Sequence, residues 1–308
     1  MKETAWTFSA AVVLALMAHP LCMADAPRRL PVADAVVVKS VEYRPGVTLK
    51  RLVAEKPRKM AAYLVQIDLT TPGIGFTATE RAPNWGEPMP DSPDFPIETE
   101  CETTADFMRR RREAGENVGI AVNAAAYHPF EYPGIHRYAA FWGWNVSNGV
   151  PLSKGRNPRN AAMFILRENG RAEIASSLSP SETDGIEFSF SGKGIILKDG
   201  EDFDDPLLLR GGTAGSVCPR TAFGLTADGK TLILLVVDGR QPGYSMGASI
   251  DDLRRILRSE GCSDAVDMDG GGSSSLVVFD RKSGTPRMLN RHKDGLVRKV
   301  GLNFGITF

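Results

Sequence analysis

The sequence predicts an α+β fold with a mixed, largely antiparallel β-sheet core, a few flanking helices and a single domain. Short apolar segments rich in β-branched and aromatic residues recur along most of the chain. Only two stretches combine helix-favouring residues with a terminating glycine. The 308 residues are 42% hydrophobic and 24% charged, which is the balance of an ordinary globular protein with one substantial core.

The first 26 residues have the layout of a signal peptide. Lys2 precedes an apolar run of eleven residues, 8–18, and small residues follow up to Ala26. A helix that crosses a bilayer needs roughly 20 apolar residues, so we expect cleavage rather than a permanent anchor. The sequence therefore predicts a secreted or periplasmic protein with no integral membrane anchor after signal cleavage.

Charge and cysteine content restrict the partners. The 37 basic and 37 acidic side chains balance, so the chain has no bulk field to attract nucleic acid or an anionic membrane. We expect no nucleic-acid partner, and any recognition of phosphate must be local. After the signal peptide the cysteines are Cys101, Cys218 and Cys262, which allow at most one disulfide and match no zinc spacing. We expect each of them to be a small buried thiol.

The order of segments predicts the main elements. Residues 27–74 are expected to form N-terminal strands and a linker, and residues 75–308 the main domain. Helices are expected at 105–114 and 250–259, and the proline-rich residues 81–96 predict a long surface loop. The predicted strands cover residues 36–41, 63–69, 75–80, 118–123, 139–146, 161–167, 171–175, 186–190, 195–198, 221–226, 231–237, 265–268, 275–280 and 300–308.

The first candidate site follows the apolar strand at residues 231–237, which ends in Asp238-Gly239-Arg240. Arg220 and Thr221 open the neighbouring strand, so both arginines are expected at the same rim of the sheet. Two guanidinium groups there would clamp a phosphodiester in a bidentate manner. The alternative is an ordinary surface turn in which Asp238 and Arg240 form an ion pair.

A glycine-rich loop forms the second candidate site. Asp269 precedes Gly270, Gly271 and Gly272, and Ser273 and Ser274 follow them. Three consecutive glycines allow the backbone to approach a ligand and to direct amides at an anion. The alternative is a flexible hairpin. The loop is neither a Walker loop nor a nucleophile elbow, because the residues that define those motifs are absent.

Two further side chains are expected near these loops. Asn123 ends the strand at 118–123, and His128 follows it, either as a polar wall of the site or as a structural histidine. No His-Glu-x-x-His pattern occurs, so a catalytic zinc is disfavoured. Asp267 and Asp269 are the candidates for holding a cation such as calcium, although we expect no cofactor to be required.

Taken together, the motifs resemble those of the phosphodiester glycosidase family, whose namesake is an N-acetylglucosamine-1-phosphodiester α-N-acetylglucosaminidase. The resemblance covers roughly residues 75–308, and its strength lies in the order and spacing of several motifs. This chain departs from the family in having Ala124-Ala125-Ala126 where glycines are common after the asparagine. The matching segments are residues 120–123, 219–221, 238–240, 247–250 and 269–274.

The resemblance implies an exported hydrolase that splits a sugar from the phosphate of a sugar-1-phosphodiester. Arg220 and Arg240, with amides of the glycine loop, would neutralise the phosphate. Asp238 or Asp269 would activate water or stabilise an oxocarbenium-like sugar, and Asn123 would hold a sugar hydroxyl. Two alternatives remain open: a metal-dependent phosphodiesterase, and a non-catalytic envelope module that binds anionic glycans.

Overall fold

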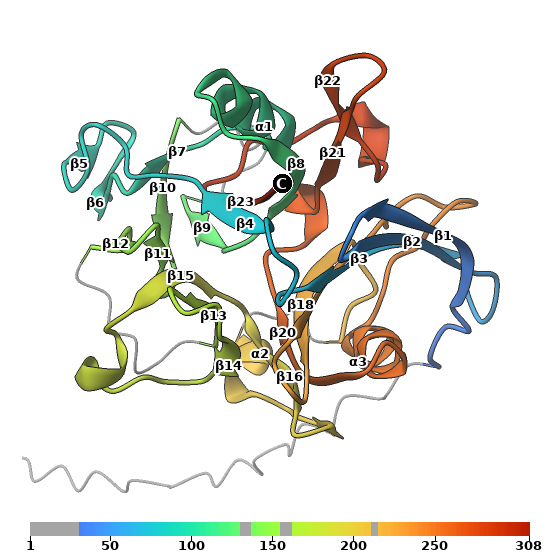
Figure 1. The fold of residues 1–308 in the computed structure, drawn as a ribbon. Coiled ribbons are helices and arrows are strands. Elements are labelled where there is room, and N and C mark those ends of the chain that lie inside the picture. The colour runs from blue at the N-terminus through green and yellow to red at the C-terminus, as the bar shows by residue number, and fades with distance from the viewer. Residues whose placement is uncertain (1–30, 130–136, 155–161, 211–214) are drawn as a thin grey trace, which may run out of the picture.

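The computed structural model describes residues 31–129, 137–154, 162–210 and 215–308. The expected signal peptide at residues 1–26 lies outside these ranges. Within them the fold consists mainly of antiparallel β-sheets with few helices, arranged as in Figure 1.

An eight-stranded sheet forms the largest part of the fold. Residues 231–237, predicted to be a central strand, form its fourth strand, and the pairings between its described strands are antiparallel. In spatial order the strands are β1 (Val36–Arg44), β2 (Val47–Ala54), β3 (Met60–Asp68), β19 (Thr231–Val237), β18 (Arg220–Thr226), β20 (Cys262–Asp267), β16 (Gly194–Lys198) and β17 (Glu201–Asp202).

Two five-stranded sheets complete the core. The first has the order β22 (Thr285–Met288), β21 (Leu276–Asp280), β8 (Val118–Asn123), β23 (Asn303–Thr307) and β4 (Gly75–Ala78). The second has the order β12 (Val150–Pro151), β11 (Val146–Ser147), β15 (Ile186–Ser191), β13 (Met163–Arg167) and β14 (Ala172–Ala175). Smaller pairings join β7 (Thr99–Glu100), β10 (Tyr138–Phe141) and β9 (Tyr127–His128), and also β5 (Pro88–Met89) with β6 (Ser92–Pro96).

Aromatic side chains from all three large sheets meet in one buried cluster. Phe304 of β23 lies 4.9 Å, ring centre to ring centre, from Phe190 of β15 and 6.1 Å from Phe223 of β18. Phe164 of β13 meets Phe223 edge-on at 5.5 Å. Such contacts add to the free energy of burying these rings. The cluster therefore fixes the sheets against one another, and with them the loops at their edges.

Two longer helices cover outer faces of the sheets. α3 (Ile250–Ser259) begins with a capping box in which Ser249 and Asp252 satisfy each other's backbone amides. Its apolar side packs with residues of β3, β19 and β20 in a second buried cluster. α1 (Thr104–Glu113) packs beside β8 and β21 (Figure 1). A shorter helix, α2 (Pro206–Arg210), follows β17.

The structure confirms the largely antiparallel sheets and the few flanking helices, but "mainly β" describes the fold more closely than α+β. The strand predictions assumed a single sheet, whereas the structure contains several. β2 was not predicted. Residues 81–96, expected to be an irregular loop, contain the β5–β6 hairpin.

Among the described residues, no helix combines the length and apolar character that crossing a membrane requires. Cys101, Cys218 and Cys262 are buried and free, as expected for structural thiols. Burial raises the pKa of Cys101 and of Cys262 to about 12, so both remain protonated thiols at neutral pH.

Candidate active site

The candidate loops converge where the eight-stranded sheet meets the sheet that contains β8. Arg220 pairs with Val237, and Ala222 pairs with Asp267. The start of β18 and the ends of β19 and β20 therefore lie at the same end of the sheet. Asn123 ends β8 beside these strand ends. The structure thus brings together most of the candidate site residues that the sequence motifs predicted.

Asn123 links the segments that meet at this site. Its side chain is fully buried, and Nδ2 donates a 2.7 Å hydrogen bond to the carbonyl oxygen of Asp269. Its Oδ1 accepts hydrogen bonds from Oγ1 of Thr221 at 2.9 Å and from the amide of Ser275 at 3.0 Å. Because these partners occupy the amide group, Asn123 acts here as a link between loops and does not point at a ligand.

Arg220 is also occupied inside the protein. Its guanidinium, 1% exposed, forms a salt bridge of 3.1 Å between Nη1 and Oδ2 of Asp267. Nη2 and Nε donate to the carbonyl oxygens of Ser216 and Ala248. Desolvation raises the pKa of Asp267, and the adjacent Arg220 opposes that shift. The buried pair therefore links the start of β18 to the end of β20.

Asp269 directly precedes the three glycines of the loop and is buried. Its amide donates to the carbonyl oxygen of Ala124 at 2.9 Å, and its Oδ1 lies 3.2 Å from Nζ of Lys193. Its Oδ2 is buried and has no hydrogen-bond partner among the described residues, and the same is true of Oδ1 of Asp267. Asp269 is therefore a buried, ion-paired carboxylate.

The chemistry of this donor set does not favour calcium. Asp267 and Asp269 are already paired with Arg220 and Lys193, and hard divalent cations usually need six or more oxygen ligands. Among the described residues, no group of three or more His, Cys, Asp or Glu side chains is placed to hold a metal ion. We therefore assign no metal to these two carboxylates.

Of the candidate carboxylates Asp238, Asp267 and Asp269, Asp238 is the one that lines a hollow. Its Oδ2 accepts a 2.8 Å hydrogen bond from the hydroxyl of Tyr244. Its Oδ1 accepts from the amide of Arg291 at 2.8 Å and from Nδ2 of Asn290 at 3.3 Å. Burial raises the pKa of Asp238, and these donors partly offset the effect. No ion pair between Asp238 and Arg240 occurs in the described structure, so the site is not the ordinary surface turn.

The glycines allow two loops to touch. A Cβ atom on Gly239 would lie 2.6 Å from the nitrogen of Pro219, and a Cβ atom on Gly270 would lie 2.9 Å from the carbonyl oxygen of Pro219. The amide of Gly271 donates to that same carbonyl oxygen, and the amide of Ser273 donates to Gly270. The amide of Ser274 donates to Gly271. Since these three amides are already used, the loop is a packed 3-10 turn (η3, Gly271–Ser273) and offers fewer donors to an anion than expected.

A hollow of about 460 Å³ opens over Asp238 and the glycine loop. Arg240 lines it, and the φ of Arg240 is 56°, a left-handed backbone conformation that is uncommon outside glycine. Arg298 lines it as well and donates from Nη1 to Oγ of Ser273 at 3.3 Å. Gly239, Gly271, Gly272 and Ser274 lie in its wall, and Oγ of Ser274 is buried without a partner among the described residues.

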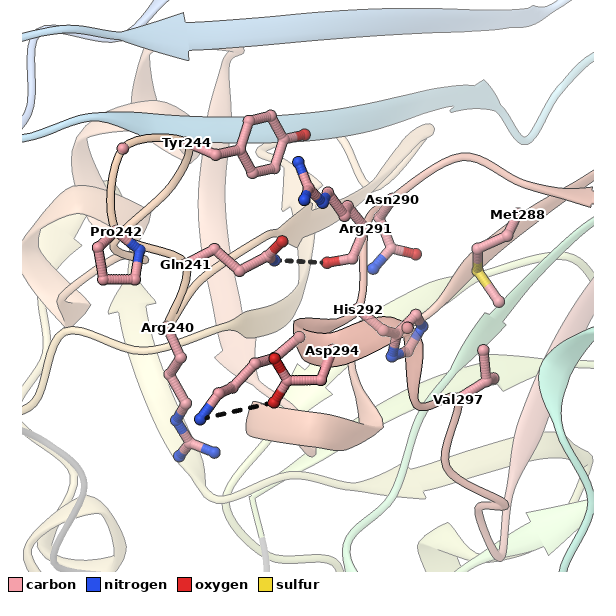
Figure 2. Close-up of a pocket in the computed structure, with 13 residues that line it drawn as sticks. Arg240, Gln241, Pro242, Tyr244, Met288, Asn290, Arg291, His292, Asp294 and Val297 are labelled. Carbon is pink, nitrogen blue, oxygen red and sulfur yellow. Dashed lines mark hydrogen bonds and ion pairs between the residues drawn. The ribbon is translucent and has the colours of Figure 1, made fainter.

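A wider hollow of about 950 Å³ continues from the first and is drawn in Figure 2. One wall runs from Arg240 to Tyr244, and the other is the segment at residues 288–297. In Figure 2 the guanidinium of Arg291 points toward Tyr244, while that of Arg240 points away from both. The two hollows adjoin at Arg240 and residues 290–297, and together they are termed the depression over Asp238.

The motifs did not reveal the wall at residues 288–299. Asn290 and Arg291 hold Asp238, while His292 bonds through Nε2 to Oγ of Ser275 at 3.2 Å. Burial lowers the pKa of His292, so it is neutral at neutral pH. The segment is charged and has no apolar periodicity, which left no strand or helix signal. His292, one of only four histidines, was the single available hint.

His128 lies outside this depression. Its ring stacks between Phe95 at 4.8 Å and Trp142 at 5.0 Å, measured between ring centres. It lines neither hollow. The structure therefore places His128 in an aromatic stack and does not bring it together with Asp238 and Arg240.

The fold and the site define a mainly β protein in which a buried carboxylate borders a pocket rich in cations. The model of the phosphodiester glycosidase family matches residues 116–307, more than half of the chain, and the chain belongs to this family. The match confirms the resemblance carried by the sequence motifs.

Individual relatives resemble shorter stretches or the fold alone. The SPbeta prophage-derived uncharacterized protein YomE of Bacillus subtilis (strain 168) is 39% identical over 82 residues, which cover 27% of this chain and only 12% of that protein. The catalytic domain of zebrafish N-acetylglucosamine-1-phosphodiester α-N-acetylglucosaminidase, auto-inhibited by its pro-peptide, superposes with a TM-score of 0.60 at 16% identity over 90% of this chain and 88% of that domain. A hypothetical protein from Synechocystis gives a TM-score of 0.60 at 14% identity over 92% of this chain and 64% of that one.

Proposed function

We propose that this chain is an exported hydrolase that cleaves the glycosidic C–O bond of a sugar-1-phosphodiester, releasing the free sugar and a phosphomonoester. The observation that carries the proposal is the position of Asp238, a buried carboxylate at the floor of a hollow that Arg240 and Arg298 also line. Membership of the phosphodiester glycosidase family and a fold like that of the zebrafish catalytic domain support it.

The substrate's own chemistry simplifies the reaction. The leaving group is a phosphomonoester, which departs as a stabilised anion and needs less proton donation than a sugar alkoxide. Arg240 and Arg298 face the hollow and neutralise the charge that develops on the phosphate. Arg220 does not reach this position, because its guanidinium is buried against Asp267.

Asp238 takes the role of activating water or of stabilising the oxocarbenium-like sugar. It borders the hollow, whereas Asp269 lines neither hollow and pairs with Lys193. The hydrogen bonds from Tyr244, Asn290 and Arg291 fix the orientation of the Asp238 carboxylate. Asp269 and Asn123 then act as positioning residues that hold the glycine loop.

Oxygen-18 water identifies the bond that breaks. Residues 27–308 are incubated with sugar-1-phosphodiesters, with and without chelator, and the products are analysed promptly by mass spectrometry. Free sugar incubated alone in the same water corrects for exchange at the anomeric hydroxyl. Heavy oxygen in the sugar and none in the phosphate establishes C–O cleavage. Heavy oxygen in the phosphate makes the protein a phosphodiesterase, and binding without turnover makes it a glycan-binding module.

Two variants test the role of Asp238. Asp238→Asn is expected to lower kcat at least about a hundredfold, because a positioned acid–base group typically contributes that much. Asp228→Asn is the matched control, since Asp228 is exposed in the turn at the opposite end of the β18–β19 pair. A stable Asp238→Asn protein with full activity would exclude the assigned role.

A further inference from the structure

The depression over Asp238 contains more positive charge than a single phosphodiester requires. The two hollows share seven lining residues, so they adjoin one another. The shared residues are Arg240, Asn290, Arg291, His292, Lys293, Asp294 and Val297. A phosphodiester carries one negative charge at neutral pH, and this space extends well beyond the volume around Asp238.

The cations in the depression outnumber the carboxylates. Five basic side chains line it, and Asp238 and Asp294 are the only acidic ones among the described lining residues. Asp294 is offset by Lys293, whose Nζ lies 3.9 Å from its Oδ2. No carboxylate of the described residues lies within 4.0 Å of Arg240 or Arg291, which leaves both available to an anion. The basic residues are Arg240, Arg291, Lys293, Arg298 and Lys299.

Arg291 is held at the junction between Asp238 and the wider hollow. Its amide bonds to Asp238, and its carbonyl oxygen accepts a 2.8 Å hydrogen bond from Nε2 of Gln241. Its guanidinium carbon lies 5.1 Å from the centre of the Tyr244 ring, a cation–π arrangement, and Figure 2 shows the two side chains next to each other. The backbone on which Arg291 sits is therefore fixed relative to Asp238, and its side chain lines both hollows.

We propose that the wider hollow is a subsite for a second phosphate group on the aglycone, held by Arg291, and that the substrates of this protein carry at least two phosphates. The subsite rests on the proposed function, since it assumes that the first phosphate lies beside Arg240 and Arg298. Two sources have this chemistry: a sugar-1-diphosphate ester, in which the phosphates are adjacent, and a glycan with repeating phosphodiesters, in which a sugar separates them.

Substrates that differ only in phosphate number test the subsite. KM is measured for one sugar-1-phosphodiester with a neutral methyl aglycone, for its diphosphate ester, and for a two-repeat phosphodiester glycan. The second phosphate is expected to lower KM about tenfold or more, as a charge-assisted contact does. One molar salt should remove most of that advantage, because it screens exposed charges. The two-phosphate substrate with the lower KM identifies the source.

Arg291→Ala is expected to abolish the ratio between two-phosphate and one-phosphate substrates. Arg287→Ala is the matched control, because this arginine is exposed on neighbouring β22, lines neither hollow and lies 3.5 Å from Asp280. Affinities of non-hydrolysable phosphonate analogues give the same ratio without turnover. Equal KM and Kd for one and two phosphates, or a ratio that survives Arg291→Ala, would overturn the subsite. A failure of C–O cleavage on every substrate would instead overturn the proposed function.

Discussion

The hydroxyl of Tyr244 donates a 2.8 Å hydrogen bond to Oδ2 of Asp238, and the ring of the same tyrosine lies beneath Arg291. The side chain of Tyr244 thus contacts both Asp238 of the candidate active site and Arg291, which lines the wider hollow. The backbone amide of Arg291 in turn donates a hydrogen bond to Oδ1 of Asp238, so the three residues contact one another. Asp238 is consequently held by groups that also shape the entrance to the depression.

Tyr244→Phe is expected to raise the pKa of Asp238, because the lost hydrogen bond stabilises the ionised carboxylate. If Asp238 acts as an anion, the acid limb of kcat/KM must move to higher pH, while the ring beneath Arg291 remains. The pH profile of the variant measures this shift. Tyr138→Phe, in β10 and outside both hollows, is the control. An unmoved acid limb would show that another group controls it.

Asn123→Ala is expected to lower the free energy of unfolding by about 2 to 4 kcal/mol, since it removes three buried hydrogen bonds and leaves partners unsatisfied. Chemical denaturation measures the loss. Asn169→Ala removes only an exposed turn contact to the amide of Arg171, and should cost less than about 1 kcal/mol. A stable Asn123→Ala protein that had lost only sugar affinity would restore the role expected from the sequence, in which Asn123 holds a hydroxyl.

Arg220→Met is expected to destabilise the protein by about 3 to 5 kcal/mol at neutral pH, because it leaves Asp267 buried without its partner. The folded-state pKa of Asp267 is already raised, and losing Arg220 raises it further. Protonation then relieves the unpaired charge. The stability difference from wild type should therefore shrink as pH falls toward that raised pKa.

Denaturation of Arg220→Met at several pH values measures this narrowing. Arg255→Met is the control, because its ion pair with Asp34 joins two exposed side chains and should contribute at most about 1 kcal/mol. If Arg220 instead bound phosphate in the depression, the variant would keep its stability and lose substrate affinity.

The sequence predicted the elements with strong periodicity and the residues at their ends. α3, β8 and β19 were predicted with the bounds that the structure shows, because each has a clear apolar pattern and a defined end. β2 was missed because Lys50 and Arg51 interrupt its apolar pattern, although their side chains lie in half-buried positions. Local periodicity does not report such tertiary contacts.

The candidate site was predicted in part for the same reason. Asp238, Arg240 and the glycine loop were identified because they end or interrupt strands. Burial could not be inferred from those motifs, so Arg220 and Asn123 were expected to face a ligand, whereas the structure uses them inside the protein. The wall that contains Arg291 and His292 depends on the return of a distant segment, and no local pattern marked it.

His292 is expected to make the protein less stable in mild acid. Burial holds the pKa of the folded-state imidazole below its ordinary value of 6.5. As pH falls through 6.5, the unfolded chain therefore takes up a proton that the folded protein does not, and stability falls. The stability that the neutral imidazole contributes is fully present above the pKa of the unfolded state and is lost as pH drops through the lower pKa of the folded state.

His292→Gln removes this titration, so the free energy of unfolding of the variant should depend less on pH between about 7.5 and 5. All other groups titrate alike in the two proteins, so the difference between their denaturation curves isolates His292. Parallel pH dependences would show that this imidazole is not held neutral by burial beside Ser275.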